Sequence, residues 1–420
     1  MRQLLTLACL LFSTALLVGQ QPSAKPIWST STDGPCRLLT TTPDGKELFT
    51  LYYKVEHEKI LGLTIGRIDV ATGKELQNYP LEEIDTPELT TTSSNWKEAR
   101  FDATPDGETL LVTIPKPYSS TRNNVYGFNT LQLYDLKTGK RRGDLIPKVV
   151  TLNPGPFSER SLSCFSPDGK YFWAFTKSYG EQLNIYSCKT GTIAFTVDHS
   201  ELKGSPQSAA FSTDGKRMAL YMNKGSSNKG SSVNVAIYSW PEGKTHKEFT
   251  LPAGTTWQML HSWKGNLAYL EAMEEDDRSK ALNASPSPHP VQAYRRVCSS
   301  FDMSADDPLS TLKKEPLVGG FGGHGMGLPD IFWDAGHTWV AYYTQHIADE
   351  KVQQAAAGKK PLAYYFWRDA KVMDAKTGKV IFEQKGVPYQ THITQNGRYL
   401  ITIGASPDLE DGIHTWQLSK

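Results

Sequence analysis

The chain has 420 residues, of which 45 are basic and 44 acidic, so its formal net charge is +1. A charge this close to neutral disfavours a nucleic-acid binder that relies on phosphate neutralisation, and we expect no nucleic-acid partner. Charged residues make up 21% and aromatic residues 11%, which permits a packed core and disfavours disorder. Length alone predicts about three domains of roughly 150 residues, unless the chain carries internal repeats.

Residues 1–20 have the composition of a signal peptide. Arg2 precedes an apolar run at 4–19, which is shorter than the roughly 20 residues that span a bilayer. No later segment is apolar enough for a membrane span. We therefore expect residues 21–420 to be exported to a periplasmic or extracellular location, with an uncleaved anchor or a lipoprotein at Cys9 as alternatives.

Loss of this leader would leave Cys36, Cys164, Cys188 and Cys298. Four cysteines are too sparse for the disulfide framework of a small secreted domain. Their spacing also matches no zinc or haem motif. We expect buried free thiols, although the disulfide state stays open, and we expect no metal and no cofactor.

A four-residue turn with glycine in its last place recurs along the chain. The copies read TPDG at 42–45 and 104–107, SPDG at 166–169, STDG at 212–215, SWKG at 262–265, WDAG at 333–336 and TQNG at 394–397. Ser or Thr first and Gly last is typical of a type I turn that ends in a left-handed glycine. Short apolar runs follow these turns, as at 110–112, 171–175, 339–343 and 399–401. A strand that is apolar on both faces must be covered on both faces.

A second glycine turn ends a later strand of most units. It reads RIDVATGK at 67–74, LYDLKTGK at 133–140, IYSCKTGT at 185–192, IYSWPEGK at 237–244 and VMDAKTGK at 372–379. Each unit then has four antiparallel strands, as in a propeller blade. Seven copies of the first turn predict an all-β fold, a seven-bladed β-propeller that fills residues 21–420 as one domain. Eight blades, or six with a degenerate fifth, stay open because residues 257–318 fit the repeat least well.

The last unit predicts how the ring closes. It offers strands at 390–394, 398–403 and 413–418 and then the chain stops. We expect its outer strand to come from residues 26–30, because this exchange would remove an exposed sheet edge.

These PDG and Tyr-Asp-x-x-Thr-Gly elements resemble those of bacterial WD-repeat-like propellers of the YVTN and Tol types. The resemblance covers nearly all of residues 21–420. It departs from eukaryotic WD repeats, because third strands end in Asp69, Asp135 or Asp374 after Ile, Tyr or Met, and no blade begins with Gly-His. The resemblance implies the fold and leaves the function open, since propellers host many activities.

Long connections are expected on one face only. The two tight turns of each blade share a face, and the insertions open on the opposite one, at 82–98, 115–130, 147–160, 223–232, 271–291, 319–330 and 345–362. Loops on a rigid scaffold often carry binding residues, although neutral drift would also lengthen them. Candidate contacts for a protein, peptide or glycan are Trp96, Tyr118, Arg122, Tyr126, Phe321 and His324. A candidate anion-binding lip consists of Arg37, Arg100 and Arg160, unless nearby acidic residues at 82–85 pair with them.

Motifs for catalysis are missing or out of context. A GxGxxG pattern occurs within 319–327, but no helix is predicted after it, so we expect a loop there and no dinucleotide site. Residues 348–358 predict one short helix. Ring closure could bring His57, His324, His346 and His392 near the channel, yet they lack metal-ligand spacing and there is no GxSxG elbow. The turn aspartates are expected to bond nearby backbone.

Two functional hypotheses follow. The first is an exported non-catalytic scaffold that binds a protein, peptide or glycan on the long-loop face. The alternative is a propeller enzyme of the lactonase or hydrolase type, with a polar or metal site at the channel mouth. Polar side chains that converge at that mouth would favour the enzyme, and an open aromatic surface would favour the scaffold.

Overall fold

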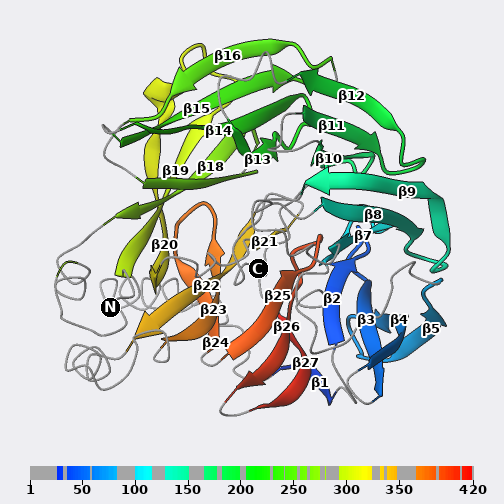
Figure 1. Ribbon diagram of the computed structural model, residues 1–420. Coiled ribbons are helices and arrows are strands. Elements are labelled where there is room, and N and C mark those ends of the chain that lie inside the picture. The colour runs from blue at the N-terminus through cyan, green and yellow to red at the C-terminus, as the bar shows by residue number, and fades with distance from the viewer. Residues whose placement is uncertain are drawn as a thin grey trace, which may run out of the picture.

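The alternation of tight glycine turns and short apolar strands produces a ring of antiparallel sheets in the computed structural model (Figure 1). The residues that the structure describes are 26–31, 36–56, 59–82, 100–115, 128–150, 165–176, 182–198, 205–227, 230–240, 242–252, 256–262, 265–274, 280, 293–323, 332–334, 338–347, 366–384, 387–406 and 409–418. Their strands form seven blades, as the repeat predicts, and each blade runs from an inner to an outer strand.

The blades follow one another along the chain. Blades 1 and 2 contain β2 (Cys36–Thr41), β3 (Glu47–Glu56), β4 (Lys59–Asp69), β5 (Glu75–Pro80), β6 (Arg100–Ala103), β7 (Thr109–Pro115), β8 (Phe128–Asp135) and β9 (Arg141–Val150). Blades 3 and 4 contain β10 (Tyr171–Thr176), β11 (Gln182–Ser187), β12 (Ile193–Asp198), β13 (Ser205–Phe211), β14 (Arg217–Ser227), β15 (Gly230–Ser239) and β16 (Thr245–Thr250). In blade 3 an isolated bridge from Phe165 to Phe172 takes the inner position.

The remaining strands complete the ring. Blade 5 contains β17 (Thr256–Ser262), β18 (Leu267–Glu274), β19 (Ala293–Asp302) and β20 (Lys313–Gly323), with the 3₁₀ helix η3 (Leu309–Thr311) before β20. Blade 6 contains β21 (Phe332–Trp333), β22 (Trp339–Ile347), β23 (Phe366–Asp374) and β24 (Val380–Gln384). Blade 7 contains β25 (Val387–Ile393), β26 (Tyr399–Ser406), β27 (Leu409–Gln417) and, as its outer strand, β1 (Trp28–Ser31).

The core is divided among the blade interfaces. Among the described residues, seven clusters of buried apolar side chains each lie between two successive blades. Neighbouring residues of one strand alternate between clusters, since Leu48 packs between blades 7 and 1 and Phe49 between blades 1 and 2. This explains the unbroken apolar runs of the sequence, because both faces of every blade are covered.

Hydrogen bonds fix both kinds of tight turn at one end of the ring, the tight-turn face. In every blade the residue directly after the third strand donates its backbone N–H to the carbonyl of the residue directly before the second strand. In the PDG turns the first hydroxyl donates to the Asp or Asn side chain, as from Thr42 to Asp44 at 2.7 Å. That side chain also accepts the N–H of the residue after the glycine, as from Lys46 at 3.1 Å. The turn aspartates therefore serve structure, as expected.

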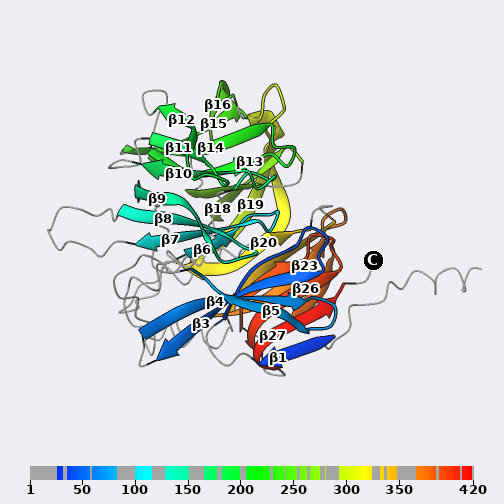
Figure 2. The ribbon, with the colours of Figure 1, turned by 90° about the vertical axis from the view of Figure 1, so that its right-hand side faces the viewer.

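The ring closes through the predicted strand exchange. β1 pairs antiparallel with β27, and the two strands lie side by side in Figure 2. Buried His414 links them, because its Nδ1 lies 2.9 Å from Ser29 Oγ and its Nε2 lies 3.0 Å from the Gly404 carbonyl oxygen. Outside the sheet, Trp28 Nε1 donates to the Val70 carbonyl oxygen of blade 1 at 2.7 Å.

Some segments expected to be loops are strands. Within 223–232, β14 continues to Ser227 and β15 begins at Gly230, and β20 runs to Gly323 through most of the glycine-rich segment. Polar and glycine-rich composition did not prevent strand formation, because the backbone groups find partners across the hairpins. β20 also pairs in parallel with β22 of the next blade at Gly320 and Gln345, which periodicity does not predict.

Candidate functional site

The closure seam is the contact between blade 7 and blade 1. On its inner side the Leu38 N–H donates to Gln390 Oε1 at 2.6 Å. At the tight-turn face Asn396 Nδ2 donates to the Asp44 carbonyl oxygen at 2.6 Å. The two turns meet so closely that a Cβ atom on Gly45 would lie 2.5 Å from the Asn396 side chain. Both turns are therefore held in one fixed relative position.

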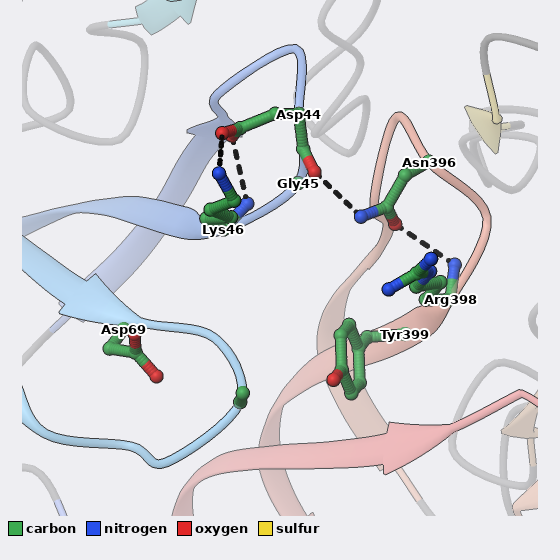
Figure 3. A pocket seen from close by; sticks show the side chains of 8 residues that line it. Asp44, Gly45, Lys46, Asp69, Asn396, Arg398 and Tyr399 are labelled. Atoms are coloured by element: carbon green, nitrogen blue, oxygen red, sulfur yellow. Dashed lines mark hydrogen bonds and ion pairs between the residues drawn. The ribbon is translucent and has the colours of Figure 1, made fainter.

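A pocket of about 430 Å³ opens at this seam on the tight-turn face (Figure 3). Blade 1 contributes its PDG turn and its second glycine turn, and blade 7 contributes the TQNG turn. The side chains that matter are those of Asp44, Lys46, Asp69, Asn396, Arg398 and Tyr399. The volume lies within the range of small-molecule sites.

The two carboxylates of the pocket are ionised and held by their own turns. The pKa of Asp44 is lowered to about 2, chiefly by the hydrogen bond from Thr42 and then by Lys46. Lys46 Nζ also lies 3.0 Å from Asp44 Oδ2. The pKa of Asp69 is lowered by Thr72, whose hydroxyl and N–H donate to Oδ1 at 2.7 and 2.8 Å. Both groups remain charged at neutral pH.

Asn396 differs from the aspartate that holds its place in the four strongest copies of the turn. Its Oδ1 accepts hydrogen bonds from Thr394 Oγ1 at 2.8 Å and from the Arg398 N–H at 3.0 Å, as an aspartate would. Its Nδ2 is a donor that an aspartate lacks, and it donates to the Asp44 carbonyl oxygen of the neighbouring blade. The substitution thus joins the blades and leaves no carboxylate beside Arg398 in its own turn.

The described thiols are unsuited to nucleophilic catalysis. Cys36 and Cys188 are free, and burial raises the pKa of Cys36 to about 12 and that of Cys188 further still. Thiolates are the reactive form, so both side chains stay inert at neutral pH. Cys164 lies outside the described residues, as does the side chain of Cys298.

No metal site is evident among the described His, Cys, Asp and Glu residues, none of which form a group of three. His392 lies on β25, with Nε2 3.5 Å from Thr41 Oγ1, and burial lowers its pKa to about 4. His57 and His324 lie outside the described part of the chain, and so does the side chain of His346.

Most of the predicted binding residues belong to segments that the structure does not describe. Trp96, Tyr118, Arg122, Tyr126, His324 and Arg160 lie outside the described residues, as does the expected helix at 348–358. Phe321 belongs to β20, although the position of its side chain is not described.

Two arginines of the predicted anion lip occupy equivalent positions in the strand register of blades 1 and 2. Arg37 pairs with Leu51 and Arg100 with Thr113, and both partners are the sixth residue after their turn glycine. The two arginines thus hold equivalent register positions on adjacent inner strands. Half-buried Arg37 lies beside Tyr53. Burial raises the pKa of Tyr53 to about 12, although the Arg37 guanidinium acts in the opposite direction.

The seam pocket was not predicted from the sequence. Its residues belong to turns that read as purely structural, and only the change from PDG to QNG marks blade 7 as different. The mutual approach of the first and last blades could have been inferred from strand exchange, but a cavity depends on side-chain packing that periodicity does not encode.

No protein-family model and no curated protein matches the chain. A chain in the crystal structure of the mitotic checkpoint complex is similar at 11% identity and a TM-score of 0.47, covering 96% of this chain and 94% of that chain. The strand order and the seven interface clusters by themselves define this protein as a seven-bladed β-propeller. Within the described residues no helix is long and apolar enough to span a bilayer.

Proposed function

We propose that this protein is a non-catalytic scaffold of the bacterial WD-repeat-like type that binds a protein, peptide or glycan on its looped face. The observation that carries the proposal is the asymmetry of the ring. One face carries short turns with hydrogen bonds between their own residues, and its longest described connection is 303–312 in blade 5. The long connections at 83–99, 116–127, 275–292 and 348–365 join strand ends at the opposite face.

The candidate anion lip supports the proposal that the partner binds on the looped face. Arg37 and Arg100 hold equivalent positions on adjacent inner strands, at the ends from which the looped face rises. An arginine forms paired hydrogen bonds with a carboxylate or phosphate in a fixed geometry. A partner with an acidic side chain or terminus would therefore be held at the channel mouth.

The test is affinity capture from extracts of the producing cell with the wild type and three double variants. The double variant W96A/F321A removes aromatic contacts, and R37Q/R100Q removes the lip. K140Q/K244Q is the matched control, because both lysines follow a second-turn glycine on the tight-turn face. We expect the first two variants to lose a partner that the wild type and the control retain. Loss with the control alone would overturn the placement on the looped face.

Export is part of the same proposal and rests on residues 1–20. The mass and N-terminal sequence of the protein recovered from its native compartment test it directly. A mature chain that begins near residue 21 outside the cytoplasm supports export, and an intact Met1 inside the cytoplasm contradicts it.

An enzyme of the lactonase or hydrolase type remains the second candidate. It would require convergent metal-binding side chains at the channel mouth. Elemental analysis of the purified protein tests its main form, since metal near one equivalent would favour the enzyme and metal near zero would remove it.

A further inference from the structure

The tight-turn face carries a cation without an acidic partner. Arg398 is the first residue after the turn glycine of blade 7, a place that Lys46 and Lys170 hold in blades 1 and 3. Those lysines pair with the aspartate of their own turn, at 3.0 and 3.1 Å. Blade 7 has Asn396 instead, and exposed Arg398 forms no ion pair with any described residue.

A carboxylate without an ion pair among the described residues lies on the wall of the same pocket. Asp69 accepts the hydroxyl and N–H of Thr72 at Oδ1 and also the backbone N–H of Ala71, but no described lysine or arginine pairs with it. Asp44 differs, because both of its oxygens are engaged, Oδ1 by Thr42 and Oδ2 by Lys46. Asp44 is thus neutralised within its own turn, and Asp69 is the carboxylate that is available to a ligand.

We propose that the seam pocket binds a small carboxylic acid that also carries a hydroxyl or ammonium donor. Arg398 holds the carboxylate and Asp69 accepts the donor. A simple anion would be attracted by Arg398 and repelled by Asp69, and a simple cation would be attracted by Asp69 and repelled by Arg398. Only a ligand with both groups satisfies both side chains.

The remaining walls suit such a ligand. Tyr399 packs against the apolar cluster of the closure seam and contributes a half-buried ring. The turn hydrogen bonds described above hold the backbone of Asp69 and Arg398 in place, so little ordering of the chain opposes binding. The volume of about 430 Å³ admits a monosaccharide acid or an amino acid.

Because the pocket has walls from blades 1 and 7, its ligand should stabilise the closed ring. A ligand that binds only the folded protein raises the midpoint of thermal unfolding, and the rise grows with the logarithm of the ligand concentration above Kd. This effect is independent of the proposed partner on the looped face, so either proposal can fail while the other stands.

The experiment measures thermal unfolding and saturation-transfer NMR with D-galacturonate, L-glutamate and acetate at equal ionic strength. We expect the first two acids to bind and to raise the unfolding temperature, and acetate to do neither. R398Q and D69N should each weaken binding about tenfold or more, since each removes a charged hydrogen bond.

Matched controls isolate the pocket from the turns. K216Q changes the residue that follows the PDG-type turn of blade 4, and D374N changes the second-turn aspartate of blade 6, both away from the seam. These variants should bind as the wild type does. Equal binding of acetate, unchanged binding by R398Q, or no response to any of the acids at tens of millimolar would overturn the proposal.

Discussion

At the scale of single residues, two glycines share a backbone conformation but differ in their surroundings. Gly243 and Gly215 have φ of +68° and +67°, a region that other residues enter at a cost of about 1 kcal/mol. A Cβ on Gly243 would overlap the ring of Phe195 from the preceding blade, whereas one on Gly215 would meet open space. Gly215 ends the first turn of blade 4 and Gly243 lies in its second turn, and packing requires a glycine only at 243.

We expect G243A to destabilise the protein by about 3 kcal/mol or more and G215A by about 1 kcal/mol. Urea denaturation of the two variants measures the difference. The added change Phe195→Leu should recover part of the loss in G243A, because it shortens the side chain that the new methyl group meets. Equal destabilisation by both alanines would contradict this assignment.

Asn396 offers a second test at this scale. N396D keeps the turn acceptor but removes the donor to the Asp44 carbonyl, and it places a negative charge against that oxygen. We expect a loss of about 1–2 kcal/mol in the free energy of unfolding. The reverse change in another blade, D168N, keeps its turn and should cost little, because the ion pair it loses to Lys170 is exposed.

The sequence predicted the turn chemistry of these residues and missed their contacts across blades. Ser or Thr, Asp and Gly at fixed spacing specify a local hydrogen-bond pattern, which is why the role of the turn aspartates was confirmed. The donor of Asn396 acts on a residue 352 positions away. No local pattern encodes such a pair, and the seam pocket was missed for the same reason.

At the scale of elements, the closing strand β1 depends on few contacts. It has four residues. It is held by its pairing with β27, by the contact of Ser29 with His414 and by the hydrogen bond from Trp28 to Val70. Its role follows from the sequence because the last unit offered only three strands. The pairing of β9 with β10 across a blade boundary was not predicted, since it depends on how far an outer strand extends.

We expect H414A to destabilise the protein by about 2–4 kcal/mol, because it removes a buried side chain and leaves the Gly404 carbonyl without its partner. Limited proteolysis should then cleave near residues 26–31 faster than in the wild type. Exposed His246 on β16 is the control, and H246A should change neither measurement. Destabilisation without faster cleavage would show that His414 does not hold β1.

At the scale of the whole molecule, stability should depend on acidity in two steps. Burial lowers the pKa of His392 from 6.5 to about 4, so the folded protein resists a proton that the unfolded chain accepts. The stabilisation is complete above about pH 6.5 and is lost as the pH falls toward 4. The lowered pKa values of turn carboxylates such as Asp44 act later, between about pH 4 and 2.

The variant H392Q should therefore lose the dependence between pH 6.5 and 4 and keep the one below pH 4. The expected difference from the wild type is on the order of 2 kcal/mol at pH 4, because the side chain is not completely sealed from solvent. Urea denaturation at pH 7, 5 and 4 measures it. A wild-type curve that is flat over this interval would contradict the assignment.

Ring closure by the chain's own ends sets the order in which this molecule can be built. Ser29 and His414 stand 385 positions apart, so blade 7 cannot be completed until nearly all of the polypeptide has been synthesised. Contacts between residues so far apart in the chain lose loop-closure entropy before they gain any contact energy, and this slows the final step of folding. During that interval the edge of β27 is an open template for strands from other chains. Yield on refolding should consequently fall with protein concentration, even though the finished ring leaves that edge covered.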